Sequence, residues 1–148
     1  MRTILTNNTN TDFIALTKLL DAELNSRYGA LQKQYDLHNT VADISHVLVV
    51  YLENLPVACG AFKIFDMQTV EIKRVFVTPE YRKRGISRHI MHRLEADAKS
   101  LGFTYAVLET GRGQPEAIAL YHNLGYAIIE NYPPYVDVST SVCMKKAL

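Results

Sequence analysis

The part of the sequence best suited to chemistry is a basic loop between a predicted strand and a predicted helix. The strand ends in Val75-Phe76-Val77, and the run RKRGISR at 82–88 leads into the helix. A helix N-terminus offers free backbone N–H groups and a positive partial charge, and Lys83, Arg84 and Arg88 add mobile positive charge beside it. This pattern predicts a phosphate-binding loop. The alternatives are an ordinary turn with solvated charges and a basic patch for nucleic acid.

Neither of the common nucleotide-binding motifs accompanies this loop. The sequence contains no G-x-x-x-x-G-K-[ST] motif. The segment Gly111-Arg112-Gly113 is followed by Glu116 at the position where a dinucleotide-binding fingerprint has its third glycine. Hydrolysis of a nucleoside triphosphate and hydride transfer therefore both lose support.

The overall composition is that of one globular domain. The 148 residues suffice for one hydrophobic core, and 48% of them are hydrophobic and 21% charged. Lys and Arg number 16 against 15 Asp and Glu, so the strong basic field of a nucleic-acid binder is missing. No apolar run approaches a membrane-spanning length, and the first residues turn polar before a signal peptide could form. We therefore expect a cytoplasmic protein with neither nucleic acid nor membrane among its partners.

The residue types that bind metals are scattered. Cys59 and Cys143 stand far apart, without the spacing of a zinc site, and the five histidines form no H-x-x-x-H pair. We expect two reduced, buried thiols and no metal site.

The elements that must position the basic loop follow from the apolar pattern. Strands are predicted where β-branched and aromatic residues cluster or alternate, at 2–6, 46–52, 57–65, 70–77, 104–110, 126–130 and 139–145. Helices are predicted where apolar residues recur at spacings of three and four residues. The predicted helices lie between the capping cluster at 7–11 and Gly29, from Gly85 to Gly102, and from Pro115 to Leu124.

Two details of this pattern matter for the fold. The segment 30–45 has weak periodicity and is either a short helix or a loop. Within 70–77 apolar and charged residues alternate, but the alternation shifts by one position after Ile72, because Val70 and Ile72 are followed by Val75 and Val77. The order of elements predicts a mixed α/β (α+β) domain whose mostly antiparallel sheet contains one crossover helix and is flanked by helices.

Two segments resemble the motifs of the GNAT superfamily of acetyl-CoA-dependent N-acyltransferases. The loop Arg82-Lys83-Arg84-Gly85-Ile86-Ser87 is similar to that family's [Q/R]-x-x-G-x-[G/A] pyrophosphate loop, with Ser87 in place of Gly or Ala. The segment AIALYHNLGY at 117–126 resembles the family's A-x-x-L-Y-x-x-x-G-[F/Y]. A predicted strand separates the two motifs, as it does in the family, and the resemblance extends from about Val47 to the last residue. It implies one GNAT domain over residues 1–148.

The resemblance also implies which residues bind acetyl-CoA. The strand end Val75, Phe76 and Val77 would lie along the pantetheine arm and pair with it like an added strand. The residues of the loop would wrap the pyrophosphate, namely Lys83, Arg84, Gly85, Ile86, Ser87 and Arg88. Gln114 lies seven residues before Tyr121, where many relatives carry a cofactor-contacting Asn; the alternative is a residue that merely adjoins the helix start.

Acetyl transfer to an amine needs a base, because an alkyl ammonium has a pKa of about 10 and must lose a proton before it attacks. Glu71 matches the base position of those relatives that have one. Its alternative role is that of an exposed strand carboxylate paired with Lys73. Glu109, at the end of the following strand, is the competing carboxylate.

The remaining catalytic roles fall to a tyrosine and to the backbone. Tyr121 resembles the tyrosine that serves the family as general acid for the departing thiolate, and otherwise it is a core residue. Backbone N–H groups near Val75–Val77 can stabilise the oxyanion.

We therefore predict an enzyme that transfers acetyl from acetyl-CoA to a primary amine without a metal. The alternative is a non-catalytic acyl-CoA-binding regulatory module of the same fold. The acceptor is not identified, since its pocket would be formed by residues 30–45 and by Tyr132–Tyr135. Dimers are common among relatives, so a homodimer is an open possibility.

Overall fold

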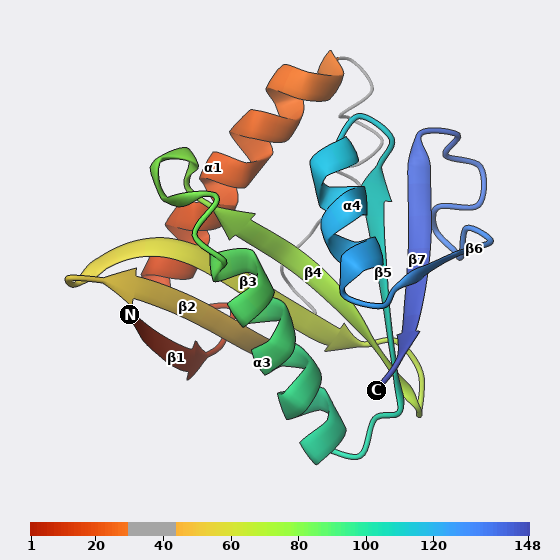
Figure 1. The fold of residues 1–148 in the computed structure, drawn as a ribbon, viewed down its shortest axis with the longest axis horizontal. Coiled ribbons are helices and arrows are strands. Elements are labelled where there is room, and N and C mark those ends of the chain that lie inside the picture. The colour runs from red at the N-terminus through yellow and green to blue at the C-terminus, as the bar shows by residue number, and fades with distance from the viewer. Residues whose placement is uncertain (30–43) are drawn as a thin grey trace.

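The computed structural model describes residues 1–29 and 44–148. Within these ranges the strands form one seven-stranded sheet in the order β1-β2-β3-β4-β5-β7-β6 (Figure 1). The strands are β1 Arg2–Thr6, β2 His46–Leu52, β3 Leu55–Ile64, β4 Thr69–Val77, β5 Tyr105–Gly111, β6 Ala127–Ile129 and β7 Ser141–Ala147. Neighbouring strands run antiparallel except β4 and β5, which are parallel. The predicted mixed α/β architecture is confirmed, although β7 begins two residues later than expected.

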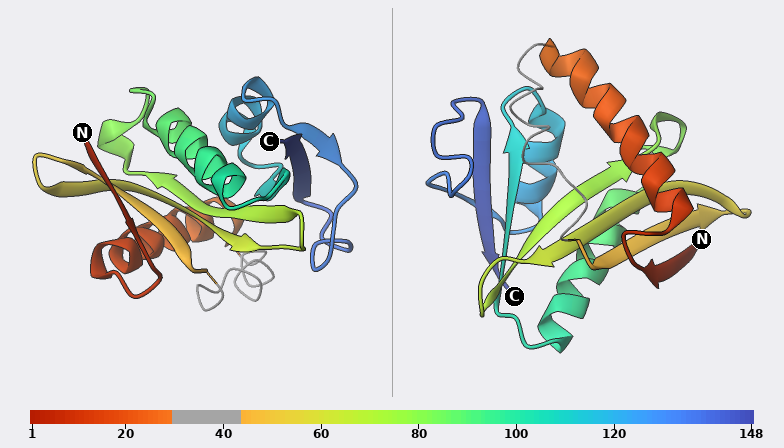
Figure 2. Two further views of the ribbon diagram at one scale, coloured as in Figure 1. Left: turned by 90° about the horizontal axis from the view of Figure 1, so that it is seen from below. Right: turned by 180° about the vertical axis from the view of Figure 1, so that it is seen from behind.

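Helices cover both faces of this sheet. They are α1 Thr11–Tyr28, α3 Ile86–Ser100 and α4 Pro115–Asn123, with a short 3₁₀ helix, η2, at Pro79–Tyr81. Figure 2 shows α1 on one face and both α3 and α4 on the other. The connection from β4 through α3 to β5 is the predicted crossover. The possible helix at 30–45 falls almost entirely outside the described residues.

Each face of the sheet has its own hydrophobic core. On the α1 face, Phe13, Leu16 and Leu20 pack against β2 and β3, and Asn10 caps the helix by accepting a hydrogen bond from the Phe13 N–H. On the other face, α3 packs on the sheet through Ile90, Met91, Leu94 and Ala98, whereas Leu101, the last apolar residue of the predicted helix, is exposed. Both cysteines are buried free thiols, as expected. No helix of the described ranges is long and apolar enough to cross a membrane.

A bulge in β4 accounts for the slip seen in the sequence. Cys59 of β3 pairs with Phe76 and Ala61 pairs with Lys73, so two residues of β4 stand opposite Gly60. One of them, Arg74, has a left-handed φ of 60°. Gly60 is required because a Cβ there would lie 2.4 Å from Ile90 of α3. The bulge therefore lies directly under the crossover helix.

β4 separates from β5 next to the bulge. Their pairing is confined to Thr69–Ile72 and Tyr105–Leu108. Figure 1 shows the two strands diverging from there toward their C-terminal ends. The carboxyl ends of parallel strands that diverge in this way leave an open crevice, which is a common place for a ligand.

Candidate active site

The divergence of β4 and β5 opens two connected cavities. The larger, about 450 Å³, is called the groove; it runs along the end of β4, the 82–88 loop and α4. The smaller, about 90 Å³, is called the chamber; its walls are Leu20, Leu24, Tyr28, Ile72, Lys73, Arg74, Val75, Leu108, Glu109, Thr110, Gly111, Gln114 and Tyr121. Leu20, Val75, Gln114 and Tyr121 line both. A ligand in the groove can therefore reach the chamber at this junction.

The structure brings nearly all of the predicted cofactor residues to the groove. They are Val75, Phe76, Val77, Lys83, Gly85, Ile86, Ser87, Arg88 and Gln114. Arg84 is the exception. Its guanidinium lies over the Tyr81 ring, 5.0 Å from the centroid, and donates to the Glu80 carbonyl oxygen. The groove is thus a continuous surface with Arg84 outside it.

The start of α3 has the properties of an anion site. Gly85 precedes the helix with a left-handed φ of 79°, and a Cβ built there meets nothing within 4 Å. No side chain among the described residues caps this helix start. The first-turn N–H groups and the side chains of Lys83 and Arg88 therefore border the groove together, which suits a pyrophosphate.

Arg82 holds the loop in place. Its Nε donates to the Val77 carbonyl oxygen at 2.8 Å, and its two terminal nitrogens donate to the carboxylate of Glu23 on α1 at 2.8 and 3.0 Å. A bidentate pair of this kind fixes orientation as well as distance. Sequence analysis did not find Glu23, since an acidic residue within a helix carries no local signal of such a partner.

Glu109 presents a carboxylate to the chamber. Its Oε2 accepts a hydrogen bond of 2.6 Å from the Ser141 hydroxyl. Burial raises the pKa of Glu109 to about 7, although the Ser141 hydrogen bond and the charge of Lys73 act in the opposite direction. A carboxylate with this pKa is a suitable proton acceptor at neutral pH.

Glu71 is placed differently. It is not among the residues that line the groove or the chamber, and only 4% of it is exposed. The Tyr132 hydroxyl donates to its Oε2 at 2.8 Å, and the ammonium groups of Lys63 and Lys73 each lie 3.8 Å from its Oε1. The expected pairing with Lys73 is present, but the carboxylate is buried rather than exposed.

The loop between β6 and β7 covers this buried pair. Tyr132 reaches Glu71, and the Tyr135 hydroxyl accepts a hydrogen bond of 3.3 Å from the Lys73 ammonium. The two rings contact each other edge to face at 5.7 Å. Burial lowers the pKa of Lys73, while the charge of Glu71 raises it. These tyrosines therefore contact Lys73 in the chamber wall and Glu71 behind it, and they do not themselves line the chamber.

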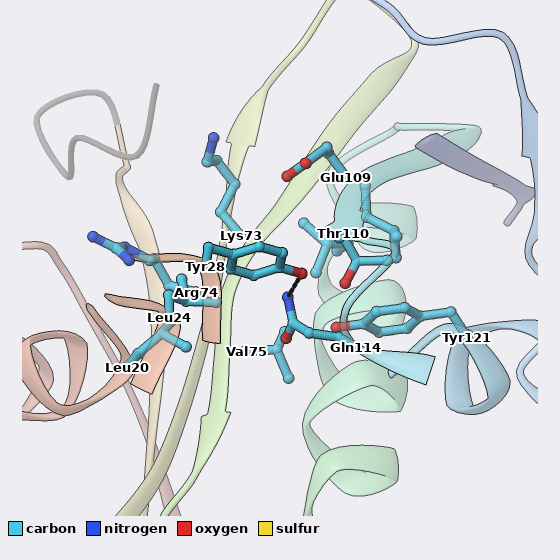
Figure 3. A pocket seen from close by; sticks show the side chains of 13 residues that line it. Leu20, Leu24, Tyr28, Lys73, Arg74, Val75, Glu109, Thr110, Gln114 and Tyr121 are labelled. Carbon is cyan, nitrogen blue, oxygen red and sulfur yellow. Dashed lines mark hydrogen bonds between the residues drawn. The ribbon is translucent and has the colours of Figure 1, made fainter. Parts of the chain in front are cut away.

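Tyr121 projects from α4 at the junction of the two cavities. Its ring packs edge to face on Tyr126 at 6.1 Å. Figure 3 shows its hydroxyl pointing into the space between α4 and Val75 of β4. Burial, reinforced by the charge of Glu109, raises the pKa of Tyr121 to about 12, so the hydroxyl carries its proton at neutral pH.

The end of α1 closes the chamber against the loop before α4. Gln114 donates to the Tyr28 hydroxyl at 3.5 Å, as Figure 3 shows, and does not cap α4 with its side chain. Arg27 donates to the Gly113 carbonyl oxygen at 3.0 Å. A Cβ at Gly111 would lie 1.8 Å from the Tyr28 hydroxyl. Gly111, which belongs to no dinucleotide fingerprint, thus allows the close approach of Tyr28, and a Cβ at Gly113 would lie 3.1 Å from the same ring.

Comparison with known proteins bears on this site. Residues 13–126 match the model of the acetyltransferase (GNAT) family. The chain is 33% identical over 137 residues to IAA acetyltransferase of Azospirillum brasilense, covering 91% of this chain and 90% of that one. The chain belongs to the GNAT acetyltransferase family. The prediction made from the two sequence motifs is confirmed.

Crystal structures of other GNAT proteins agree with the fold. A Klebsiella pneumoniae protein assigned as an acyl-CoA N-acyltransferase superposes with a TM-score of 0.82 at 30% identity, covering 99% of this chain and 97% of that one. A GNAT acetyltransferase of Elizabethkingia anophelis with acetyl-CoA bound superposes with a TM-score of 0.66 at 18% identity, covering 79% and 83%. The fold of this chain is thus shared with these proteins.

Proposed function

We propose that this GNAT enzyme transfers the acetyl group of acetyl-CoA directly to a primary amine, with Glu109 as general base and Tyr121 as general acid. The observation that carries the proposal is the junction of groove and chamber. Two side chains border the chamber there. Glu109, on β5, has a pKa of about 7, and Tyr121, on α4, keeps its proton at neutral pH. Acetyl-CoA, when bound, supplies an activated acetyl thioester.

The groove fits the donor by its shape and charge. The start of α3 with Lys83 and Arg88 suits the pyrophosphate. The backbone of Val75–Val77 continues past the last β4–β5 pair, so it can pair with an extended pantetheine arm. The Elizabethkingia structure contains acetyl-CoA, which supports the same donor here.

Glu109 is the better candidate for the base because it borders the space that the acceptor must enter. An alkyl ammonium has a pKa of about 10, and a carboxylate with a pKa of about 7 accepts its proton more readily than an ordinary one. Glu71 is separated from the chamber and already accepts a hydrogen bond from Tyr132. We assign Glu71 the role of a buried anchor for the β6–β7 loop.

Tyr121 and the β4 backbone complete the mechanism. The N–H groups near Val75–Val77 would stabilise the negative charge that develops on the carbonyl oxygen. The Tyr121 hydroxyl would donate its proton to the departing sulfur, and a pKa of about 12 ensures that the proton is present.

Two matched variants test the choice of base. Glu109→Gln should lower kcat by about 10²-fold to 10⁴-fold and leave the affinity for acetyl-CoA unchanged. Glu71→Gln should chiefly lower the melting temperature, because it alters a buried hydrogen-bonded carboxylate. Turnover of an amine panel, measured by CoA release, and calorimetry with CoA give both quantities. The reverse pattern would assign the base to Glu71, and CoA binding without transfer to any amine would indicate a non-catalytic module.

A further inference from the structure

The chamber has two cationic side chains, Lys73 and Arg74, and one anionic side chain, Glu109, in its walls. Lys73 comes from β4 and Glu109 from β5, and Figure 3 shows both reaching to the same side of the sheet across the gap between the strands. The positive charge of Lys73 lowers the pKa of Glu109, and the negative charge of Glu109 raises that of Lys73. Because both groups line one chamber of about 90 Å³, they can contact the same small ligand.

The other charges around Lys73 have partners outside the chamber. Arg74 donates to both carboxylate oxygens of Asp21 on α1, at 2.7 and 3.4 Å. Glu71 lies 3.8 Å from Lys63 on β3 as well as from Lys73. Of the two cations in the chamber walls, Arg74 is thus held by Asp21, while Lys73, which also contacts Glu71 and the Tyr135 hydroxyl, shares the chamber with Glu109.

The size of the chamber limits the acceptor. One water-sized group needs about 10 to 15 Å³ of such space, so a chamber of about 90 Å³ holds about six to nine non-hydrogen atoms. This is the size of a small amino acid.

We propose that the acceptor is a small amino acid, held with its ammonium group at Glu109 and its carboxylate at Lys73. The proposal rests on the proposed function and names its substrate class. A simple alkylamine of equal size lacks the group that Lys73 would bind. A polyamine would bring a second positive charge toward Lys73 and Arg74.

The reaction follows from this placement. The ammonium gives a proton to the Glu109 carboxylate, and the free amine attacks the carbonyl carbon of the thioester. A C–N bond forms, the C–S bond breaks, and the sulfur takes the Tyr121 proton. The nitrogen gives up its second proton, which restores the Tyr121 hydroxyl, and Glu109 releases the first proton to solvent. In the product the amine has become an uncharged amide group, and the carboxylate remains. The product therefore lacks the positive charge that Glu109 binds, and it is released more readily.

The experiment compares each small amino acid with its own carboxamide, from glycine to valine, by CoA release. The acid form of at least one should have a kcat/KM about 10-fold to 100-fold above that of its amide, the range for a hydrogen bond to a charged group. The amine of the amide is less basic, so this preference does not come from a larger supply of free amine. Lys73→Met should reduce the ratio to about one. Lys63→Met, which alters the other lysine beside Glu71, should leave it unchanged.

The possible results separate this inference from the proposed function. If amides or alkylamines are acetylated as well as the acids, the inference is wrong and the acetyltransferase assignment stands. A folded Lys73→Met protein that keeps the acid preference also overturns it. If no amine is acetylated although acetyl-CoA binds, both proposals fail. If Lys73→Met does not fold, the ratio of kcat/KM for an amino acid to that for its carboxamide in the unaltered protein still tests whether the acceptor is an amino acid.

Discussion

Ser141 should set the pH at which the enzyme works. It is the first residue of β7, it is 1% exposed, and its hydroxyl donates a 2.6 Å hydrogen bond to Glu109. The bond stabilises the charged carboxylate more than the protonated form. Ser141→Ala removes it, so the pKa of Glu109, already about 7, should rise further.

The size of the effect follows from the hydrogen bond. A bond to a charged group contributes about 1.5 to 3 kcal/mol, and 1.36 kcal/mol corresponds to one pH unit. The acid limb of kcat/KM against pH should therefore move upward by about one to two pH units. At pH 7 the ionised fraction of Glu109 would fall from about one half to between about a tenth and a hundredth, so kcat/KM falls about 5-fold to 50-fold.

The assay is kcat/KM with a fixed acceptor from about pH 6 to about pH 10, beside the melting temperature of each protein. Ser141→Thr is the matched control, because it keeps the hydroxyl and should keep the parent profile. The reasoning is refuted if Ser141→Ala loses activity by the same factor at every pH, or if its profile coincides with that of the parent.

Two further predictions concern the groove and the acid. Gly85→Val and Gly102→Val both place a β-branched residue at a left-handed φ with open space around the Cβ, so each should cost about 1 to 2 kcal/mol of stability. Only Gly85→Val should abolish CoA binding in calorimetry; equal affinities would show that the pyrophosphate binds elsewhere. Tyr121→Phe should lower kcat about 10²-fold at constant CoA affinity and melting temperature. Tyr126→Phe, which loses only a hydrogen bond to Glu95, should lower the melting temperature but not the rate, and full activity in Tyr121→Phe would leave that residue a packing role.

The sequence was most informative where the chemistry lies in continuous segments. The loop at 82–88 and the segment at 117–126 each carry a motif within about ten residues, and the structure places most of the loop at the groove. The slip after Ile72 marked the bulge because alternation responds to a single extra residue. Local pattern was enough in these cases.

The choice between the two carboxylates could not be made in this way. Glu71 and Glu109 are both strand glutamates among apolar neighbours, and they differ through contacts with distant residues. Tyr132 meets Glu71 from 61 positions away, and Ser141 meets Glu109 from 32. The first contact depends on how the β6–β7 loop folds over the sheet and the second on the pairing of β5 with β7, and no local pattern encodes either. Most of the segment 30–45, which was expected to shape the acceptor pocket, lies outside the described residues, since these leave out 30–43.

The bulge in β4 also bears on how this chain can change in length. Ile72 before the bulge and Val77 after it both pack into the α3 core, although five positions separate them, while Phe76 packs on the α1 side. A strand without a bulge points successive side chains to opposite faces of the sheet. Deletion of Arg74 would restore this alternation in β4, so its core side chains would stay on the faces where they now pack. A deletion of Arg74 is therefore silent in the hydrophobic core. The deletion removes the ion pair of Arg74 with Asp21 and changes the direction in which β4 leaves β5, so the gap between these strands can vary in evolution without a change of fold.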